Sequence, residues 1–594
     1  MKLFLSKYAP ARHLEAALGD PYEDGLFSYA QRVAEDEEER YPVDALHRLD
    51  AWGMQQYYVP AHWGGALRDF ETLFALVRTI SRRDLTVAVS HAVSFLGSAG
   101  VWIAGSQDLQ RMLAARLLQG ERISLALTER EHGGDLLSCE TKADPGEDQL
   151  RILQGEKWLI NGATRNPLLS VLARTSPNGG SRGFSLFLFD KHAAQPETFA
   201  CLDKVHTLGV RGGDISGIRF QDAAVKAAAM IGDAGQGFET VIKGLYLSRL
   251  LCGAMSLGAA ETAFQMTLDF ALSRRLYGGT VFDIPHCRRL LVESWVDLLL
   301  CESMITAAAR SLHFVPSEAS VHSAVVKYLV PHILEHTFKQ LSIVLGARHY
   351  LREGLHFGIF QKMLRDNSLV SLFDGSSVVN LYSLTTQFKA LSRSWTKSQH
   401  RPADGFALHM CDLAAPLPEF SWHKLALVGG GENCFIDSLR SSLNAVRGLA
   451  GSACLPDNVA ALLPQQADAL ENAAHKLMAE VDSVNFGAPH RVTSEAFDRA
   501  ADYCTLEAAA MTLQTYLANR AYTEADRSGG QWLVLALARL NTMLGQKPRL
   551  SDDLMKDLGE QLLKNQTEKP GFRPREFSPL CRPAPETFLE LQSS

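Results

Sequence analysis

This sequence lacks an excess of positive charge, paired cysteine motifs and long apolar runs. Its 59 Lys and Arg residues are outnumbered by 66 Asp and Glu residues, and the formal net charge is −7. That balance gives no electrostatic reason to expect nucleic acid or an anionic membrane as a partner. Ten cysteines are scattered along the chain without a CxxC pair, which argues against a structural zinc site and a secreted disulfide framework. We therefore predict no metal site.

The sequence also predicts no targeting or membrane-spanning segment. The apolar start Met1–Leu5 is too short for a signal peptide. No window approaches the ~18–20 uninterrupted apolar residues of a spanning helix. We expect a cytoplasmic protein on this basis and leave association with a membrane surface open.

The chain has enough hydrophobic residues to form several domain cores. At 594 residues it is too long for one ordinary core, and 46% hydrophobic with 21% charged residues describes a folded protein. We predict an α+β, mostly α protein. Its domains are an N-terminal helical domain (1–121), a middle β-barrel or sandwich domain (122–234), a helical bundle (235–395) and a C-terminal helical domain (420–594). The polar, proline-containing residues 396–419 are predicted to be a linker.

Hydrophobic periodicity supports these divisions. Phe70–Ile80 and Leu109–Leu118 carry apolar residues at helical spacing. Short β-prone runs then alternate with turn residues at Ile123–Thr128, Trp158–Ala163, Ser170–Thr175, Phe184–Phe189 and Ser216–Phe220. Long Leu- and Ala-rich segments predict bundle helices at Phe238–Arg275, Pro285–Phe314 and Ser320–Leu345.

The most informative segment is ALTEREHGGDLLS at 126–138. A predicted strand ends at Thr128 and Glu129 and runs into Gly133-Gly134, where backbone N–H groups can approach an anion or a planar ligand closely. A tight structural turn explains the pattern equally well. The following GEKWLING at 155–162 places Trp158 on a strand of the same domain. There its ring packs either against an aromatic cofactor or in the core.

Further segments follow along the chain. They are LGVRGGD at 208–214, IGDAGQGF at 231–238, ALSRRLYGG at 271–279, LRDN at 364–367 and LFDGSS at 372–377. In this order and spacing, the set resembles the TExxxGSD, KxWITN, LGxRGS, GxGF, RxxFG, RDA and YEGT motifs of the acyl-CoA dehydrogenase family, over about residues 1–390. The extra C-terminal helical part resembles that of the very-long-chain branch, whose members pair as homodimers and use the extension at the inner membrane surface.

The resemblance implies an FAD-dependent enzyme of fatty acid metabolism, with the FAD between the β domain and the bundle. The implied FAD contacts are Leu127 and Thr128 at the flavin ring, Gly133 and Gly134 in the glycine turn, Trp158 and Ile160 beside the isoalloxazine, Ser376, and Arg274 with Tyr277 reaching the FAD of a neighbouring subunit. The implied substrate contacts are Arg249, Phe373 and Gly375.

The same resemblance implies that Asp374 is the catalytic base. A thioester α-proton is weakly acidic, so its base must be a carboxylate of raised pKa in a site stripped of water. Phe373 and Leu372 would supply an apolar wall, and a backbone N–H would stabilise the enolate. Some family members place the base on the first bundle helix instead. That position is Ser248 here, next to Arg249, so no carboxylate competes with Asp374.

The chain also departs from the family pattern. Asp374 is one methylene shorter than the usual Glu, a deficit of ~1 Å, and a misplacement of that size can cost on the order of a hundredfold in rate. Asp374 could instead cap the helix that follows. The Ser of GSD is Gly134, Trp158 directly follows Lys157, and 343–350 lacks the Gln and two glycines that approach the partner's FAD. Each loss removes about 1 kcal/mol of net hydrogen bonding.

Three functional hypotheses remain open. The first is an α,β-dehydrogenase of an acyl-CoA or a carrier-protein-bound acyl group that passes electrons to an electron-transfer flavoprotein. The second keeps the flavin but reacts with oxygen, as an oxidase or monooxygenase. The third is a catalytically degenerate relative retained as a binding or assembly protein.

Overall fold

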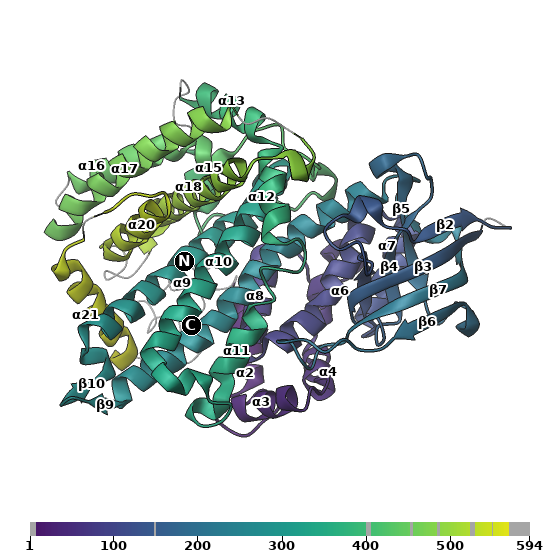
Figure 1. The fold of residues 1–594 in the computed structure, drawn as a ribbon, viewed down its shortest axis with the longest axis horizontal. Coiled ribbons are helices and arrows are strands. Elements are labelled where there is room, and N and C mark those ends of the chain that lie inside the picture. Colours follow the sequence, from purple (N-terminus) through teal and green to yellow (C-terminus); the bar gives the residue numbers. More distant parts are fainter. Residues whose placement is uncertain are drawn as a thin grey trace, which may run out of the picture.

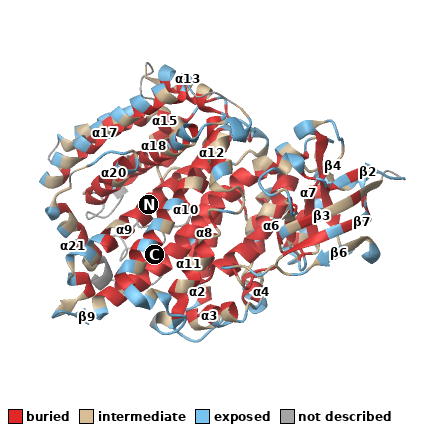
Figure 2. Cartoon of the chain, viewed as in Figure 1, coloured by how far each residue is buried: buried red, intermediate tan, exposed pale blue. Residues whose placement is uncertain are grey.

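The computed structural model describes residues 8–147, 150–399, 405–451, 455–483, 487–522, 529–548 and 550–568. Figure 1 shows a β domain on one side of a large helical body, with the last part of the chain layered over the outer face of that body. Figure 2 shows buried residues continuing from the central helices into this outer layer. The division into helices, β domain and bundle, with additional C-terminal helices, confirms the predicted fold class.

The N-terminal region is helical as predicted. Its helices are α2 (Ala9–Leu18), α3 (Tyr29–Glu37), α4 (Val43–Trp52), α5 (Phe70–Arg83), α6 (Leu85–Ala104) and α7 (Gln107–Leu118). Aspartates cap the central pair, since Asp69 accepts the N–H of Thr72 on α5 and Asp84 that of Thr86 on α6. Helix α6 is long and apolar enough to cross a membrane, but 83% of its most apolar window is buried inside the protein. It is therefore a core helix of this fold.

The middle domain is an eight-stranded sheet in the described part of the chain, with the order β6-β7-β3-β2-β4-β5-β8 and β1 paired in parallel with β4. The strands are β1 (Ile123–Ala126), β2 (Lys142–Pro145), β3 (Leu150–Asn161), β4 (Leu168–Arg174), β5 (Phe184–Asp190), β6 (Phe199–Leu202), β7 (Ile215–Lys226) and β8 (Met230–Ile231). Although β5 and β7 are not neighbours in this order, the rings of Phe189 and Phe220 lie 5.0 Å apart. The sheet therefore curls around its own apolar core, as the barrel or sandwich prediction requires.

Long helices form the bundle. They are α8 (Gly237–Ser273), α9 (Pro285–Phe314) and α10 (Ala319–Leu345), followed by the short α11 (Ile359–Asn367) and α12 (Ser377–Thr385). Helix α8 packs against α5, α6, α9, α10 and α11. It is buried on almost every face because neighbours surround it, which explains its Leu-, Ala- and Gly-rich sequence. A hairpin, β9 (Arg275–Leu276) with β10 (Gly279–Thr280), follows its C-terminus.

The C-terminal helices share one apolar core with the bundle. They are α13 (Phe388–Ser398), α14 (Phe406–Cys411), α15 (Cys434–Asp437), α16 (Leu439–Ala450), α17 (Asp457–Val481), α18 (Ser494–Asn519), α20 (Gln531–Met543) and α21 (Asp552–Glu568). Helices α18, α20 and α21 all contact α9, and Arg539 of α20 pairs with the buried Asp297 of α9 at 2.5 Å. The extension is therefore packed on the bundle.

The predicted linker at 396–419 is not an exposed tether where the structure describes it. Helix α13 continues to Ser398, and α14 falls within the segment. The fully buried guanidinium of Arg310 on α9 donates to the carbonyls of Met410, Asp412 and Ala415. The linker prediction was wrong for this part because its polar backbone is satisfied by a buried cation rather than by water.

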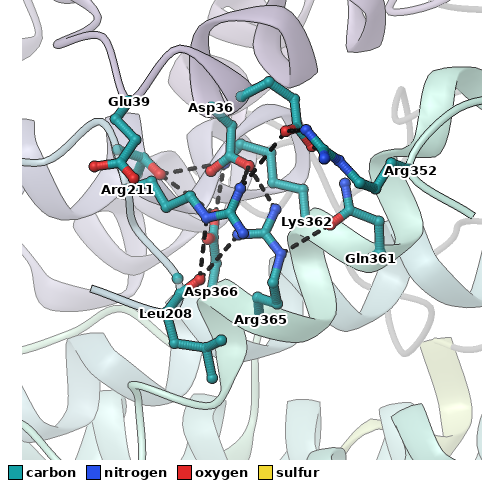
Figure 3. A network of polar contacts seen from close by, with 12 residues as sticks. Asp36, Glu39, Leu208, Arg211, Arg352, Gln361, Lys362, Arg365 and Asp366 are labelled. Atoms are coloured by element: carbon teal, nitrogen blue, oxygen red, sulfur yellow. Dashed lines mark hydrogen bonds and ion pairs between the residues drawn. The ribbon is translucent and has the colours of Figure 1, made fainter. Parts of the chain in front are cut away.

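A polar network locks the N-terminal helices, the β domain and the bundle together (Figure 3). Lys362 of α11 contacts the carboxylate of Asp366 at 2.5 Å and that of Asp84 at 2.6 Å. Asp366 also accepts the backbone N–H of Val210, at 2.6 Å, from the LGVRGG loop of the β domain. Arg365 reaches Asp36 of α3. The LGxRGS-like and RDA-like segments thus fix the orientation of the β domain on the bundle.

Candidate active site

Asp374 lies on the loop between α11 and α12, and the loop backbone is strained. Asp374 has φ 56° and Gly375 has φ 100°, both in the left-handed region that L side chains rarely adopt. A Cβ added at Gly375 would lie 2.8 Å from Nη2 of Arg249. Glycine is therefore required here both by the backbone conformation and by the close approach of an arginine.

Buried side chains from three helices hold this loop. The Lys327 ammonium of α10 donates to the carbonyls of Val370 (2.7 Å) and Gly375 (3.2 Å). Nε of Arg249 on α8 donates to the Asp374 carbonyl at 3.0 Å, and Asn380 of α12 donates to that of Gly375 at 2.8 Å. Such over-determination is what allows a strained backbone to persist.

The Asp374 carboxylate has a different environment from its backbone. Its Oδ2 lies 3.8 Å from the Cys252 thiol, and Ser248 also faces it from α8. Burial raises the pKa of Asp374, while the nearby Lys327 ammonium partly opposes the rise. Its side chain does not cap α12, because the N-cap residue is Ser376. The capping alternative is therefore wrong, and the carboxylate has the environment expected of a base.

The residues predicted beside Asp374 are only partly placed as expected. Phe373 is half-buried and packs on the bundle core, with its ring 5.3 Å from the Lys327 nitrogen. Leu372 is 63% exposed, so it does not form an apolar wall within this chain. Arg249 is buried and contacts the loop backbone, and Ser376 begins α12. Roles for Arg249, Phe373 and Gly375 in substrate binding stay predictions.

The TExxxGSD-like loop folds back on its own domain through Glu129. The carboxylate accepts the backbone N–H groups of Glu140 (2.6 Å) and Thr141 (2.9 Å), and it pairs with the fully buried Lys157 ammonium at 2.8 Å. Although burial alone would raise the pKa of Glu129, Lys157 and these hydrogen bonds hold it below its usual value. The sequence interpretation missed this pair. An acidic residue just after one strand and a lysine inside another was the available signal.

The Glu129–Lys157 pair accounts for the position of Trp158. With Lys157 turned inward, Trp158 is half-buried and lies outside the apolar clusters of the described residues. The Trp158 N–H donates to the Thr128 carbonyl at 2.9 Å, and the Thr128 hydroxyl donates to the Trp158 carbonyl at 2.6 Å. Arg130 lies 4.5 Å above the indole ring. An accessible indole beside Thr128 fits a flavin contact.

Two other predicted flavin contacts, Ile160 and Leu127, have buried side chains. Ile160 is 3% exposed inside the β-domain core, because an irregularity at Leu159 (φ 57°) separates it from Trp158. Its side chain is therefore not available to a ligand. Leu127 is also buried, and its carbonyl accepts from Lys157.

The glycine turn lies next to the helix that follows Asp374. Gly133 and Gly134 are exposed, and a Cβ at Gly134 would lie 3.7 Å from Val379 of α12. A Cβ at Gly133 would meet nothing within 4 Å, so this side of the turn has room for a ligand. The fold thus brings the glycine turn to the helix that starts at the Asp374 loop. These two segments are more than 200 residues apart in the sequence.

Arg274 and Tyr277 lie elsewhere. Arg274 precedes the β9–β10 hairpin and Tyr277 lies in its turn, and this hairpin sits at the opposite end of the bundle from the β domain in Figure 1. Arg274 is exposed and Tyr277 is 97% exposed. One chain therefore cannot bring them to Trp158, and their predicted FAD contact requires a second subunit. Arg352, also exposed, pairs with Glu37 of α3.

The family comparison matches three consecutive parts of the chain. Residues 23–121, 124–223 and 235–387 match the models of the acyl-CoA dehydrogenase N-terminal, middle and C-terminal domains. A curated relative in Mycobacterium tuberculosis, named "Probable acyl-CoA dehydrogenase FadE25", is 26% identical over 347 residues, which cover 58% of this chain and 87% of the relative.

Solved structures share the fold. An acyl-CoA dehydrogenase from Bacillus anthracis complexed with FAD is similar over 95% of both chains, with a TM-score of 0.63 and 16% identity. The prolyl acyl carrier protein oxidase AnaB is similar over 63% of this chain and 96% of its own, with a TM-score of 0.57 and 18% identity. The first likeness extends over the C-terminal helices. From the family-model matches, the chain belongs to the acyl-CoA dehydrogenase family of FAD-dependent oxidoreductases.

Proposed function

We propose that this protein is an acyl-thioester α,β-dehydrogenase in which Asp374 removes the α-proton. The observation that carries the proposal is the separation of charges around Asp374. The nearby cations donate to loop carbonyls, whereas the carboxylate meets a thiol and a hydroxyl. A carboxylate without a direct ion pair keeps the raised pKa that proton abstraction from carbon requires.

The chain's own residues would act in sequence around the acyl group. The strained loop, held by Lys327 and Arg249, aims the Asp374 carboxylate and limits its motion. Transfer of the α-proton to Asp374 leaves charge on the thioester oxygen, which backbone N–H groups of the site would stabilise. FAD, held near Thr128, Trp158 and the glycine turn, would accept the hydride from the β-carbon.

The shorter side chain is compatible with this role. Ser248 and Cys252, on consecutive turns of α8, both lie against the Asp374 carboxylate. A substrate would have to sit deeper by about the length of one methylene to meet it. We infer that the acyl group carries little bulk next to its α-carbon. Whether it is attached to CoA or to a carrier protein is part of the test below.

The test is a flavin spectrum of the purified full chain. We expect bound flavin that is bleached anaerobically by an acyl thioester, with CoA esters and carrier-bound esters compared at matched chain length. Asp374→Asn should keep the flavin and lower the bleaching rate by about 10²–10⁴-fold. Asp374→Glu should retain more of the wild-type bleaching rate than Asp374→Asn. Asp24→Asn, at an exposed aspartate, is the matched control.

Each result has a defined meaning. Full bleaching by Asp374→Asn would refute the assignment of the base. A folded protein that refuses FAD would refute the redox function altogether. If dioxygen reoxidises the reduced flavin within turnover and an electron-transfer flavoprotein does not, the protein is an oxidase rather than a dehydrogenase.

A further inference from the structure

A second cluster of reactive side chains lies where the C-terminal helices meet the bundle. Glu318 ends the short helix before α10, His322 is in the first turn of α10, and Cys434 begins α15. One ligand atom from each of the three lies within 4.8 Å of the other two. No step of the proposed function uses these residues.

A second carboxylate orients the histidine. Nδ1 of His322 lies 2.7 Å from Oε1 of the fully buried Glu507 on α18. The other Glu507 oxygen accepts from Asn433 at 2.6 Å, and Asn433 also donates to the Tyr503 hydroxyl. With Nδ1 held in this way, Nε2 is directed at Glu318 Oε2 (3.1 Å) and Cys434 Sγ (4.0 Å). A carboxylate that orients a histidine from behind is typical of metal sites.

We propose that Glu318, His322 and Cys434 bind a Zn²⁺ ion that fastens the C-terminal helices to the bundle. Zinc bonds of ~2.0–2.3 Å in tetrahedral geometry place ligand atoms roughly 3.3–3.6 Å apart. The observed separations of 3.1 and 4.0 Å lie on either side of that range, so small side-chain shifts would suffice. A thiolate with an imidazole selects zinc over the oxygen-preferring Mg²⁺ and Ca²⁺.

The charges at the site agree with a cation. Glu318, Glu507 and a Cys434 thiolate would bring three negative charges to a place where Glu318, His322 and Glu507 are at most 5% exposed. A divalent ion offsets two of them, and the third, on Glu507, accepts a hydrogen bond from the Asn433 amide. Cys434 is half-buried as a whole residue, but its thiol belongs to a buried cluster, and a water molecule would have to supply the fourth ligand of a tetrahedral ion.

The site would have a structural role. Glu318 and His322 belong to the part of the chain that matches the family models, whereas Cys434 and Glu507 lie beyond residue 387, where the last model match ends. His322 is also five residues before Lys327 on the same helix. A metal bond here would therefore join the extension to the end of α10 that holds the Asp374 loop. The sequence predicted no metal because its donors lie far apart and only the fold assembles them.

The test is metal analysis of the full chain purified from zinc-supplemented cells. We expect stoichiometric zinc in the wild type and near-complete loss in Cys434→Ser and His322→Gln, with the buried Cys301→Ser on α9 as the matched control. Replacement by Co²⁺ should give a thiolate-to-cobalt charge-transfer band that Cys434→Ser lacks. A chelator should lower the Tm of the wild type and of Cys301→Ser, but not that of Cys434→Ser.

A folded wild type that holds no zinc after supplementation, and whose Tm ignores the chelator, would overturn the proposal. The centre would then be a His322 imidazolium shared by Glu318 and Glu507. A cobalt spectrum unchanged by Cys434→Ser would overturn the assignment of the ligand set. These readouts do not depend on flavin or turnover, so failure here and failure of the proposed dehydrogenase can be told apart.

Discussion

Helix α8 carries the buried Glu261 and contacts the partly buried Asp374, two carboxylates whose surroundings are opposite. Near its middle, Glu261 is contacted directly by Arg82, whose Nε lies 2.7 Å from Oε2, and by Arg78 through two nitrogens. Nearer the start of α8, Cys252 contacts the Asp374 carboxylate. The two cations near Asp374, Arg249 and Lys327, donate to backbone carbonyls instead of to that carboxylate. Although burial acts on both groups, the pKa of Glu261 is lowered to about 2 and that of Asp374 is raised.

The difference teaches what separates a structural carboxylate from a reactive one. Both have two cations close by, so the presence of positive charge does not decide the outcome. What decides it is whether the cation donates to the carboxylate or to a main-chain oxygen beside it. At Asp374 the cations hold the loop in place and leave the carboxylate free to take a proton.

The largest effect is expected when the ion pairs of the structural carboxylate, Glu261, are removed. Glu261→Gln leaves Arg78 and Arg82 short of a buried counter-charge, and we expect a loss of about 3–5 kcal/mol in the free energy of unfolding. Glu239→Gln on the same helix, where the exposed pair with Lys243 is lost, should cost less than about 1 kcal/mol. Chemical denaturation at pH 7 measures both, and equal losses would refute the contrast.

The stability loss of Glu261→Gln should depend on pH. The pKa of Glu261 is about 2 when folded and near its ordinary 4.5 when unfolded. Its stabilising contribution is therefore complete above pH 4.5 and is lost as pH falls towards 2. The stability gap between wild type and Glu261→Gln should narrow by about 3 kcal/mol over that window. If the difference in free energy of unfolding between the two proteins stayed constant in acid, ionisation of Glu261 would not be its cause.

On the reactive side, Gly375→Ala should have the next largest effect. The added methyl group would meet the Arg249 guanidinium at 2.8 Å on a backbone with φ 100°, so the Asp374 loop must move. We expect a rate loss on the order of a hundredfold. Gly346→Ala, at φ 59° with nothing within 4 Å, imposes backbone strain without the contact and should leave the rate nearly unchanged. Single-turnover flavin reduction distinguishes them.

Lys327→Met tests the cation that donates to carbonyls. It leaves the Val370 carbonyl without its buried donor, at a cost of about 1–3 kcal/mol. Because Lys327 lowers the pKa of Asp374 against the effect of burial, its removal raises that pKa further. The acid limb of the kcat/KM profile should move to higher pH. The exposed Lys339→Met on the same helix should move neither quantity, and a shift to lower pH would contradict the assignment.

The smallest effect is expected for Cys252→Ala. A thiol is a weak donor, and its contact with the Asp374 carboxylate is 3.8 Å long. We expect the acid limb to rise by less than about one pH unit, with a rate change under about tenfold. Cys301→Ala, buried on α9, controls for lost packing. A change as large as that of Lys327→Met would assign Cys252 a larger part in holding the base.

Some parts of the site could be predicted because their signals are local. Short motifs in a fixed order predict Asp374, the glycine turn and the Thr128–Trp158 region as site residues, and the structure places the turn beside α12, the helix that follows the Asp374 loop. The inward turn of Lys157 could not be found in this way. It depends on Glu129, which comes from the loop after β1, and a pattern read along β3 alone does not contain that residue.

By itself, the sequence determined the helical and β textures, the long buried helices and the family. These follow from hydrophobic period and motif order, which are properties of neighbouring residues. Only the tertiary structure decided which carboxylates are paired, where the supposed linker packs, and that Glu318, His322, Cys434 and Glu507 meet. The reason is physical, since pairing and burial depend on distances between residues far apart in the chain, and these exist only once the helices have packed.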